Sequence, residues 1–126
     1  MSKAVPPACV LITGATGGIG GALAMVYAEP GRTLILHGRN AVRLREVAAL
    51  CAARGARVLT QVLDVRDTAA LRAWLATLCA QESLDLVIVN AGVNTNIGPQ
   101  GAGERWQDVE ALFEVNLLAA LATVDA

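Results

Sequence analysis

A glycine-rich turn, Thr13–Gly20 (TGATGGIG), joins an apolar segment to an amphipathic one. Gly14 would permit a tight turn out of a strand, Gly18 would let the backbone approach a pyrophosphate, and Gly20 would let a helix pack closely. The N–H groups at the start of that helix would then face the phosphates. This context predicts a dinucleotide-binding turn rather than a simple loop. The residues of the turn that we expect to contact a cofactor are Gly14, Thr16, Gly17, Gly18, Ile19 and Gly20.

The segment His37-Gly38-Arg39-Asn40 ends the second apolar strand, where a dinucleotide-binding fold selects its ribose. Gly38 removes the acid that would hold a free 2′-hydroxyl, and Arg39 can bind a 2′-phosphate through charge-assisted hydrogen bonds. NADP(H) is therefore favoured over NAD(H), with Arg39 and Asn40 as contacts. Alternatively, Arg39 is a solvated surface residue and Asn40 only caps the next helix. His37 has no second ligand nearby in the sequence and is expected to be structural rather than catalytic.

Alternating strands and helices must position these residues. Apolar, β-branched runs predict strands at Ala8–Thr13, Thr33–His37, Arg57–Leu63 and Leu84–Asn90. Helical periodicity predicts helices at Gly18–Glu29, Ala41–Arg54 and Thr68–Gln81. This rhythm is typical of a doubly wound α/β layer with a parallel sheet. The apolar positions expected to face the sheet are Ile19, Leu23 and Val26, then Leu44, Val47 and Leu50, then Leu71, Leu75 and Leu78.

The C-terminal part predicts one more loop and one more helix. A polar loop at Asn94–Gly103 leads to a helix from about Glu104. Its apolar stripe would consist of Val109, Leu112, Phe113, Leu117 and Val124. The composition stays helical to Ala126 with no Gly or Pro stop signal, so we expect residues 1–126 to form a single domain that is incomplete at its C-terminus.

The bulk composition narrows the class of protein. Ten basic and eleven acidic residues are scattered along 126 residues, so nothing favours nucleic acid or a membrane surface. No apolar run approaches the roughly 18 residues of a membrane span, and the N-terminus lacks a secretion signal, which predicts a cytoplasmic protein. Cys9, Cys51 and Cys79 are odd in number and far apart. We expect buried free thiols rather than a disulfide framework or a zinc site.

Four motifs in order resemble the classical short-chain dehydrogenases/reductases. TGATGGIG matches TGxxxGxG, LDV at Leu63–Val65 matches the acidic motif after the third strand, NAG at Asn90–Gly92 matches the signature after the fourth, and Asn116 in FEVNLLA matches the helix asparagine. The extended branch of the family uses TGxxGxxG, which this turn also satisfies, but NAG favours the classical branch. The resemblance covers essentially the whole chain and corresponds to the N-terminal half of a family member.

The resemblance implies a Rossmann-type sheet of four strands in the order 3-2-1-4 with four helices. It places Asp64 and Val65 along the adenine, and Asn90, Ala91 and Gly92 along the cofactor cleft. Asn116 would bend its helix and hold a water in a proton relay, as a supporting catalytic residue. Each has an alternative: Asp64 as a loop or helix-capping acid, Asn90 as a turn former, and Asn116 as a tolerated polar residue.

The family's catalytic pair is missing from this sequence. In the family, a tyrosine activated by a lysine four residues later protonates the substrate oxygen with the help of a serine. Here the only tyrosine is Tyr27, which is followed four residues later by Gly31, and the only lysine is Lys3. The lack of a Gly-Lys-Ser/Thr after the glycines also excludes a P-loop. The resemblance therefore implies the NADP(H)-binding part of an oxidoreductase, inactive on its own.

The complete protein would transfer hydride between NADPH and a carbonyl or alcohol, as a homo-oligomer. Another possibility is a non-catalytic nucleotide-binding or self-associating module, because the fourth strand would keep an unpaired edge. A methyltransferase or another doubly wound enzyme would leave NAG and Asn116 unexplained.

Overall fold

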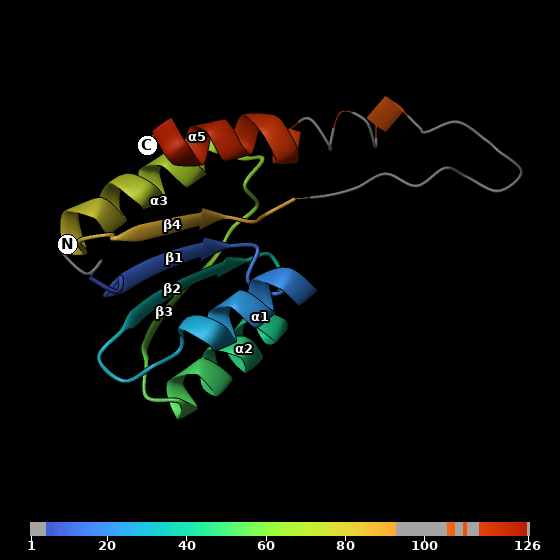
Figure 1. Ribbon diagram of the computed structural model, residues 1–126. Helices are drawn as coiled ribbons and strands as arrows, with labels where there is room; N and C mark the ends of the chain where they lie inside the picture. Colours follow the sequence, from blue (N-terminus) through green and yellow to red (C-terminus); the bar gives the residue numbers. More distant parts are fainter. Residues whose placement is uncertain (1–4, 93–105, 108–109, 111–113, 126) are drawn as a thin grey trace, which may run out of the picture.

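The fold is built on a four-stranded parallel sheet (Figure 1). The computed structural model describes residues 5–92, 106–107, 110 and 114–125. Its strands are β1 (Cys9–Thr13), β2 (Thr33–Gly38), β3 (Arg57–Val62) and β4 (Leu86–Val89). The helices α1 (Gly18–Tyr27), α2 (Ala41–Ala53) and α3 (Thr68–Gln81) alternate with them, and a π-helical segment η2 (Glu114–Ala119) continues into α5 (Ala120–Asp125). The strands pair in the order β3-β2-β1-β4, which confirms the predicted Rossmann-type order.

Two apolar cores lie on the two faces of the sheet, and β1 contributes to both. Cys9 and Leu11 pack with α3 and α5, whereas Val10 and Ile12 pack with α1 and α2. Figure 1 shows these two pairs of helices on opposite faces of the sheet. Because both faces are covered, consecutive residues of β1 are all buried, as is usual for a parallel sheet. The predicted core positions of α3, Leu71, Leu75 and Leu78, are confirmed as buried.

The predicted core face of α1 is wrong at two of its three positions, because only Leu23 packs against the core. Ile19 and Val26 are 72% and 68% exposed, and α1 instead turns Gly20 and Ala24 toward the sheet. A Cβ on Gly20 would collide with the Gly14 carbonyl oxygen. The start of α1 therefore approaches the glycine turn too closely for a larger side chain, and this approach, rather than the apolar stripe, sets the rotation of the helix.

Some of the other predicted core positions also face solvent. Leu50 of α2 is 57% exposed and Val124 of α5 is 75% exposed. Cys9 and Cys51 are buried free thiols as predicted, but Cys79 is a free thiol on the surface. It follows the buried Leu78 by one residue, which is about 100° around a helix.

Part of the C-terminal prediction lies outside the described residues: the loop Asn94–Gly103, the helix start at Glu104, and Val109, Leu112 and Phe113. Among the residues that the structure describes, no helix is both long enough and apolar enough to cross a membrane.

Candidate functional site

A cavity of about 220 Å³ lies where the carboxyl ends of the strands meet, the usual ligand position in open α/β sheets. Four segments form it: the glycine turn after β1, the end of β2, the residues after β3 and the residues after β4. Nine of the thirteen predicted cofactor residues line it, together with His37 and Gly38. The nine are Gly14, Thr16, Gly17, Arg39, Asp64, Val65, Asn90, Ala91 and Gly92.

The glycine turn has the conformation that its sequence predicts. Gly14 has a φ of +69°, and a Cβ there would lie 2.7 Å from the Cα of Ala91, so only glycine fits. No side chain caps α1, because its N-cap residue is Gly17. A Cβ on Gly18 would have no atom within 4 Å. The backbone N–H groups at the start of α1 thus lack a side-chain cap, and the surface at Gly18 is open. This arrangement suits a phosphate.

His37 connects the glycine turn to the segment after β3. Its side chain is 2% exposed. The backbone N–H of Gly14 donates to His37 Nδ1 at 3.1 Å, so the proton of the neutral ring resides on Nε2, which donates to the Leu63 carbonyl at 2.7 Å. Burial lowers the pKa of His37, against smaller opposing effects of the Leu63 carbonyl and Asp64. The expected structural role of this residue agrees with these contacts.

Asn90 and Thr13 hold the NAG segment against the glycine turn. Asn90 Nδ2 donates to the Gly14 carbonyl at 3.1 Å. Thr13 Oγ1 accepts from the backbone N–H groups of Asn90 at 3.0 Å and Ala91 at 3.1 Å. Sequence reasoning assigned no role to the Thr13 hydroxyl, although its place at a strand end directly before Gly14 is a usable signal. Hydrogen bonds therefore join the two predicted motifs, the glycine turn and the NAG segment.

The three residues at the end of β2, Gly38, Arg39 and Asn40, differ in exposure and in contacts. Arg39 is exposed and lines the cavity. Asn40 caps α2, since its Oδ1 accepts from the Arg43 N–H at 3.1 Å, and its contact with a cofactor stays a prediction. Gly38 is buried, and a Cβ there would lie 2.7 Å from Cγ2 of Thr16. An acid at this position would therefore collide with the glycine turn.

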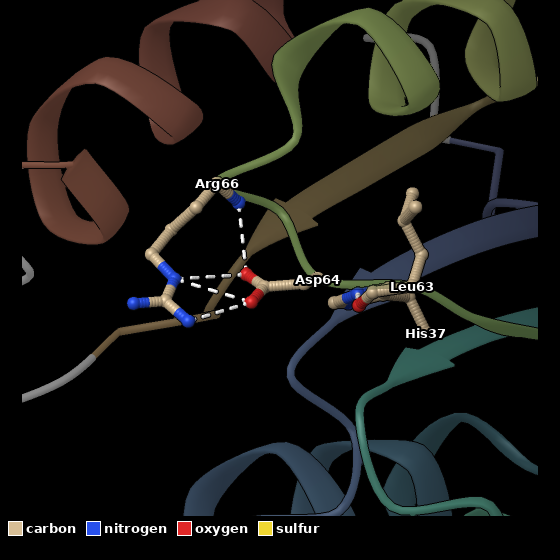
Figure 2. A network of polar contacts seen from close by, with 4 residues as sticks. All are labelled: His37, Leu63, Asp64 and Arg66. Atoms are coloured by element: carbon tan, nitrogen blue, oxygen red, sulfur yellow. Dashed lines mark hydrogen bonds and ion pairs between the residues drawn. The ribbon is translucent and has the colours of Figure 1, made fainter.

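Asp64 is clamped by Arg66, as Figure 2 shows. Its Oδ1 accepts from the Arg66 backbone N–H at 3.0 Å and from Nε at 3.2 Å, and its Oδ2 accepts from Nε at 3.1 Å and Nη2 at 2.8 Å. These hydrogen bonds are the main cause that lowers the pKa of Asp64. Asp67, not Asp64, caps α3. Sequence reasoning did not find Arg66, because no motif contains it.

The remaining predicted residues lie around the cavity rather than in its wall. Gly18 and Ile19 are exposed, and Gly20 is buried beneath the turn. Asn116 belongs to η2, and its Oδ1 would lie 3.1 Å from a Cβ placed on Gly92. The π-helical geometry at Asn116 is of the kind often found at functional sites. Among the residues that the structure describes, no three His, Cys, Asp or Glu side chains gather as metal ligands.

Known proteins resemble this chain in both sequence and fold. A family profile described as short chain dehydrogenase matches residues 8–126. The NADP-dependent 3-hydroxy acid dehydrogenase YdfG of Salmonella typhi is 39% identical over 101 residues, which cover 78% of this chain and 40% of that protein.

Two solved structures share the fold. A short chain dehydrogenase of Escherichia coli CFT073 complexed with NADPH has a TM-score of 0.82 and 30% identity, covering 94% of this chain and 50% of that one. An NAD⁺-bound xylitol dehydrogenase has a TM-score of 0.83 and 25% identity, covering 94% and 45%. The chain thus spans about half or less of the length of these proteins. The motifs, the strand order and the match over residues 8–126 show that this chain belongs to the short-chain dehydrogenase family.

Proposed function

We propose that the chain binds NADP(H) through the adenosine and pyrophosphate end of the cofactor. The observation that carries this proposal is that Arg39 lines the same cavity as the glycine turn, including Gly17, the N-cap residue of α1, which no side chain caps. A 2′-phosphate and a pyrophosphate carry negative charge, and these groups offer a guanidinium and backbone N–H donors to it. When bound, the nicotinamide would supply the hydride chemistry of the family.

Each segment of the cavity has a proposed role. The glycine turn and the first N–H groups of α1 hold the pyrophosphate, with Gly18 and Ile19 at its edge. Arg39, with Asn40 beside it, holds the 2′-phosphate. Asp64 and Val65 lie along the adenine, and Asn90, Ala91 and Gly92 form the opposite wall. The hydrogen bonds that join Asn90 to Thr13 and Gly14 hold the two walls in a fixed position relative to each other.

The preference for NADP(H) rests mainly on Gly38 and Arg39. The Salmonella relative is named as NADP-dependent and one structural relative is complexed with NADPH, whereas another holds NAD⁺. Arg39 lines the cavity, and position 38 has no carboxylate to hold a free 2′-hydroxyl. These residues favour the phosphorylated cofactor.

A complete oxidoreductase of this kind would transfer hydride between NADPH and a carbonyl or alcohol, with Asn116 in a supporting role. Tyr27 lines a separate cavity with Pro6 and Asp85, beside the start of β1 and β4. It therefore lies away from the cofactor cavity and has no lysine four residues later. We propose that these 126 residues alone do not catalyse this hydride transfer. A cytoplasmic location stays a prediction.

Calorimetric titration of the full chain with NADPH and NADH tests this proposal. We expect tighter binding of NADPH, and Arg39→Gln should weaken it roughly ten- to hundredfold with little effect on NADH. Arg45→Gln, which removes the same charge from the exposed surface of α2, is the matched control. Equal affinities for the two cofactors would remove the 2′-phosphate site, and carbonyl-dependent NADPH oxidation above background would disprove the proposed inactivity.

A second candidate is self-association, favoured by the surface around α5. Leu118, Leu121 and Val124 are 54%, 58% and 75% exposed, and β4 pairs only with β1 within the described part of the chain. Exposed apolar groups and an unpaired strand edge both promote contacts between copies. Sedimentation at micromolar concentration should show dimers or larger species, whereas a clean monomer would count against this candidate.

A further inference from the structure

Two opposite charges share the wall of the cofactor cavity. Arg39 and Asp64 both line it, and the Asp64 side chain is 39% exposed. If these were the only charged groups near a 2′-phosphate, the carboxylate would repel the phosphate that Arg39 attracts. A site that prefers the phosphorylated cofactor must therefore offset this carboxylate.

Arg66 lies where it can do so. It binds both carboxylate oxygens of Asp64 through its side chain, with Nε shared between them and Nη2 at 2.8 Å from Oδ2 (Figure 2). This fork geometry fixes the guanidinium against the carboxylate more firmly than a single contact would. Hydrogen bonds from Arg66 lower the pKa of Asp64, and the charge of Arg39 lowers it further, so the carboxylate stays ionised at neutral pH. Protonation does not remove the negative charge, and only a cation can offset it.

The charge balance around the cavity follows from these contacts. His37 is neutral, because burial lowers its pKa. Arg66 pairs with Asp64, so the carboxylate is offset and no longer cancels the charge of Arg39 in the cavity wall. A phosphate that carries nearly two negative charges gains from the charge of Arg39, whereas a 2′-hydroxyl does not.

We propose that Arg66 is a specificity-determining residue for the phosphorylated cofactor, acting by neutralising Asp64. Arg66 itself is not in the cavity wall, so it acts through the carboxylate and not by binding the phosphate. The inference rests on the proposed function of the cavity and adds a residue that the glycine turn and Arg39 do not explain.

Arg66→Gln tests the inference in a titration of the full chain with NADPH and with NADH. Because the pair is partly exposed and solvent screens it, we expect NADPH to bind roughly three- to tenfold more weakly and NADH to change by less than about twofold. Arg66→Lys, which keeps the charge but not the fork, should retain most of the preference. Arg57→Gln is the matched control, since it breaks a 2.8 Å ion pair with Glu82 near the opposite end of β3 and should leave both affinities unchanged.

The Asp64→Asn background separates neutralisation from a structural effect. Without the carboxylate there is nothing to offset, so adding Arg66→Gln should change the ratio of NADPH to NADH affinity by less than about twofold. A full loss of preference in that background, or equal weakening of both cofactors by Arg66→Gln alone, would overturn the inference. If the unmodified chain binds neither nucleotide, the proposed function fails instead, and this outcome is distinguishable from the others.

Discussion

His37 Nδ1 accepts a hydrogen bond from the backbone N–H of Gly14 at 3.1 Å, while the other ring nitrogen binds the Leu63 carbonyl at 2.7 Å. One buried ring thus joins the phosphate side of the cavity to the residue before Asp64. The histidine is neutral, so it brings no charge to either predicted phosphate position. Its contribution is to fix two backbone segments that lie far apart in the sequence.

Removing this ring should destabilise the protein. His37→Phe fills the space but leaves the Gly14 N–H and the Leu63 carbonyl, both partly buried, without the histidine as a partner. An unpaired polar group in a buried position costs about 1–3 kcal/mol. We expect a loss of about 2–4 kcal/mol in the free energy of unfolding, measured by urea titration. His37→Gln retains a donor and an acceptor and should lose less. Equal stability of His37→Phe and the unmodified chain would show that these bonds contribute nothing net.

The same ring predicts a pH dependence of stability. Burial lowers the pKa of His37 below its ordinary value of 6.5. The unfolded chain therefore binds a proton at a higher pH than the folded chain does, and between these two pKa values the free energy of unfolding rises with pH. Stability should be full above about pH 6.5 and should fall as the solution is acidified below it.

Urea unfolding of the unmodified chain and of His37→Gln between about pH 7.5 and about pH 5 checks this sign. The sequence contains one histidine, so the difference between the two proteins isolates its titration. Asp64 does not interfere, because its lowered pKa confines its loss of stabilisation to more acidic solution. Parallel curves for the two proteins would contradict the prediction.

The strands and α3 could be predicted because local periodicity decides them: Leu71, Leu75 and Leu78 recur at helical spacing and are buried. The face of α1 could not, because its rotation depends on how closely Gly20 approaches the Gly14 carbonyl. The contacts of His37 could not be predicted either. Its partners are backbone groups 23 and 26 residues away, and backbone groups leave no side-chain pattern in a sequence.

Two glycines of the turn should respond differently to alanine. Gly20→Ala would drive a methyl group into the Gly14 carbonyl and should cost at least about 3 kcal/mol of stability. Gly18→Ala meets no atom within 4 Å and should leave stability within about 1 kcal/mol. Because we propose that Gly18 lies at the edge of the pyrophosphate site, the same variant should weaken NADPH binding roughly tenfold or more. Thermal unfolding and calorimetry on both variants measure this, and unchanged NADPH affinity in Gly18→Ala would place the pyrophosphate elsewhere.

A simple exchange of cofactor preference should fail for a steric reason. Gly38→Asp supplies the carboxylate that a free 2′-hydroxyl needs, but its Cβ would lie 2.7 Å from Cγ2 of Thr16. We expect the single variant to lose NADPH binding without gaining NADH binding. The double variant Thr16→Ser/Gly38→Asp removes the obstructing methyl group and should bind NADH better than NADPH. If the Gly38→Asp chain already prefers NADH and its stability is unchanged, the Thr16 side chain moves aside without a measurable cost, which would contradict this prediction.

The position of the cofactor's adenosine end can be measured directly by NMR titration of the full chain with adenosine 2′,5′-bisphosphate. If the cavity holds this end of NADP(H), amide shifts should concentrate at Gly14, Gly17, Arg39, Asp64 and Val65, all in the wall of one cavity. Tyr27 and Asp85, which line a separate cavity, should not shift. Shifts confined to that second cavity, or no shifts at millimolar ligand, would contradict the assignment of this site to NADP(H).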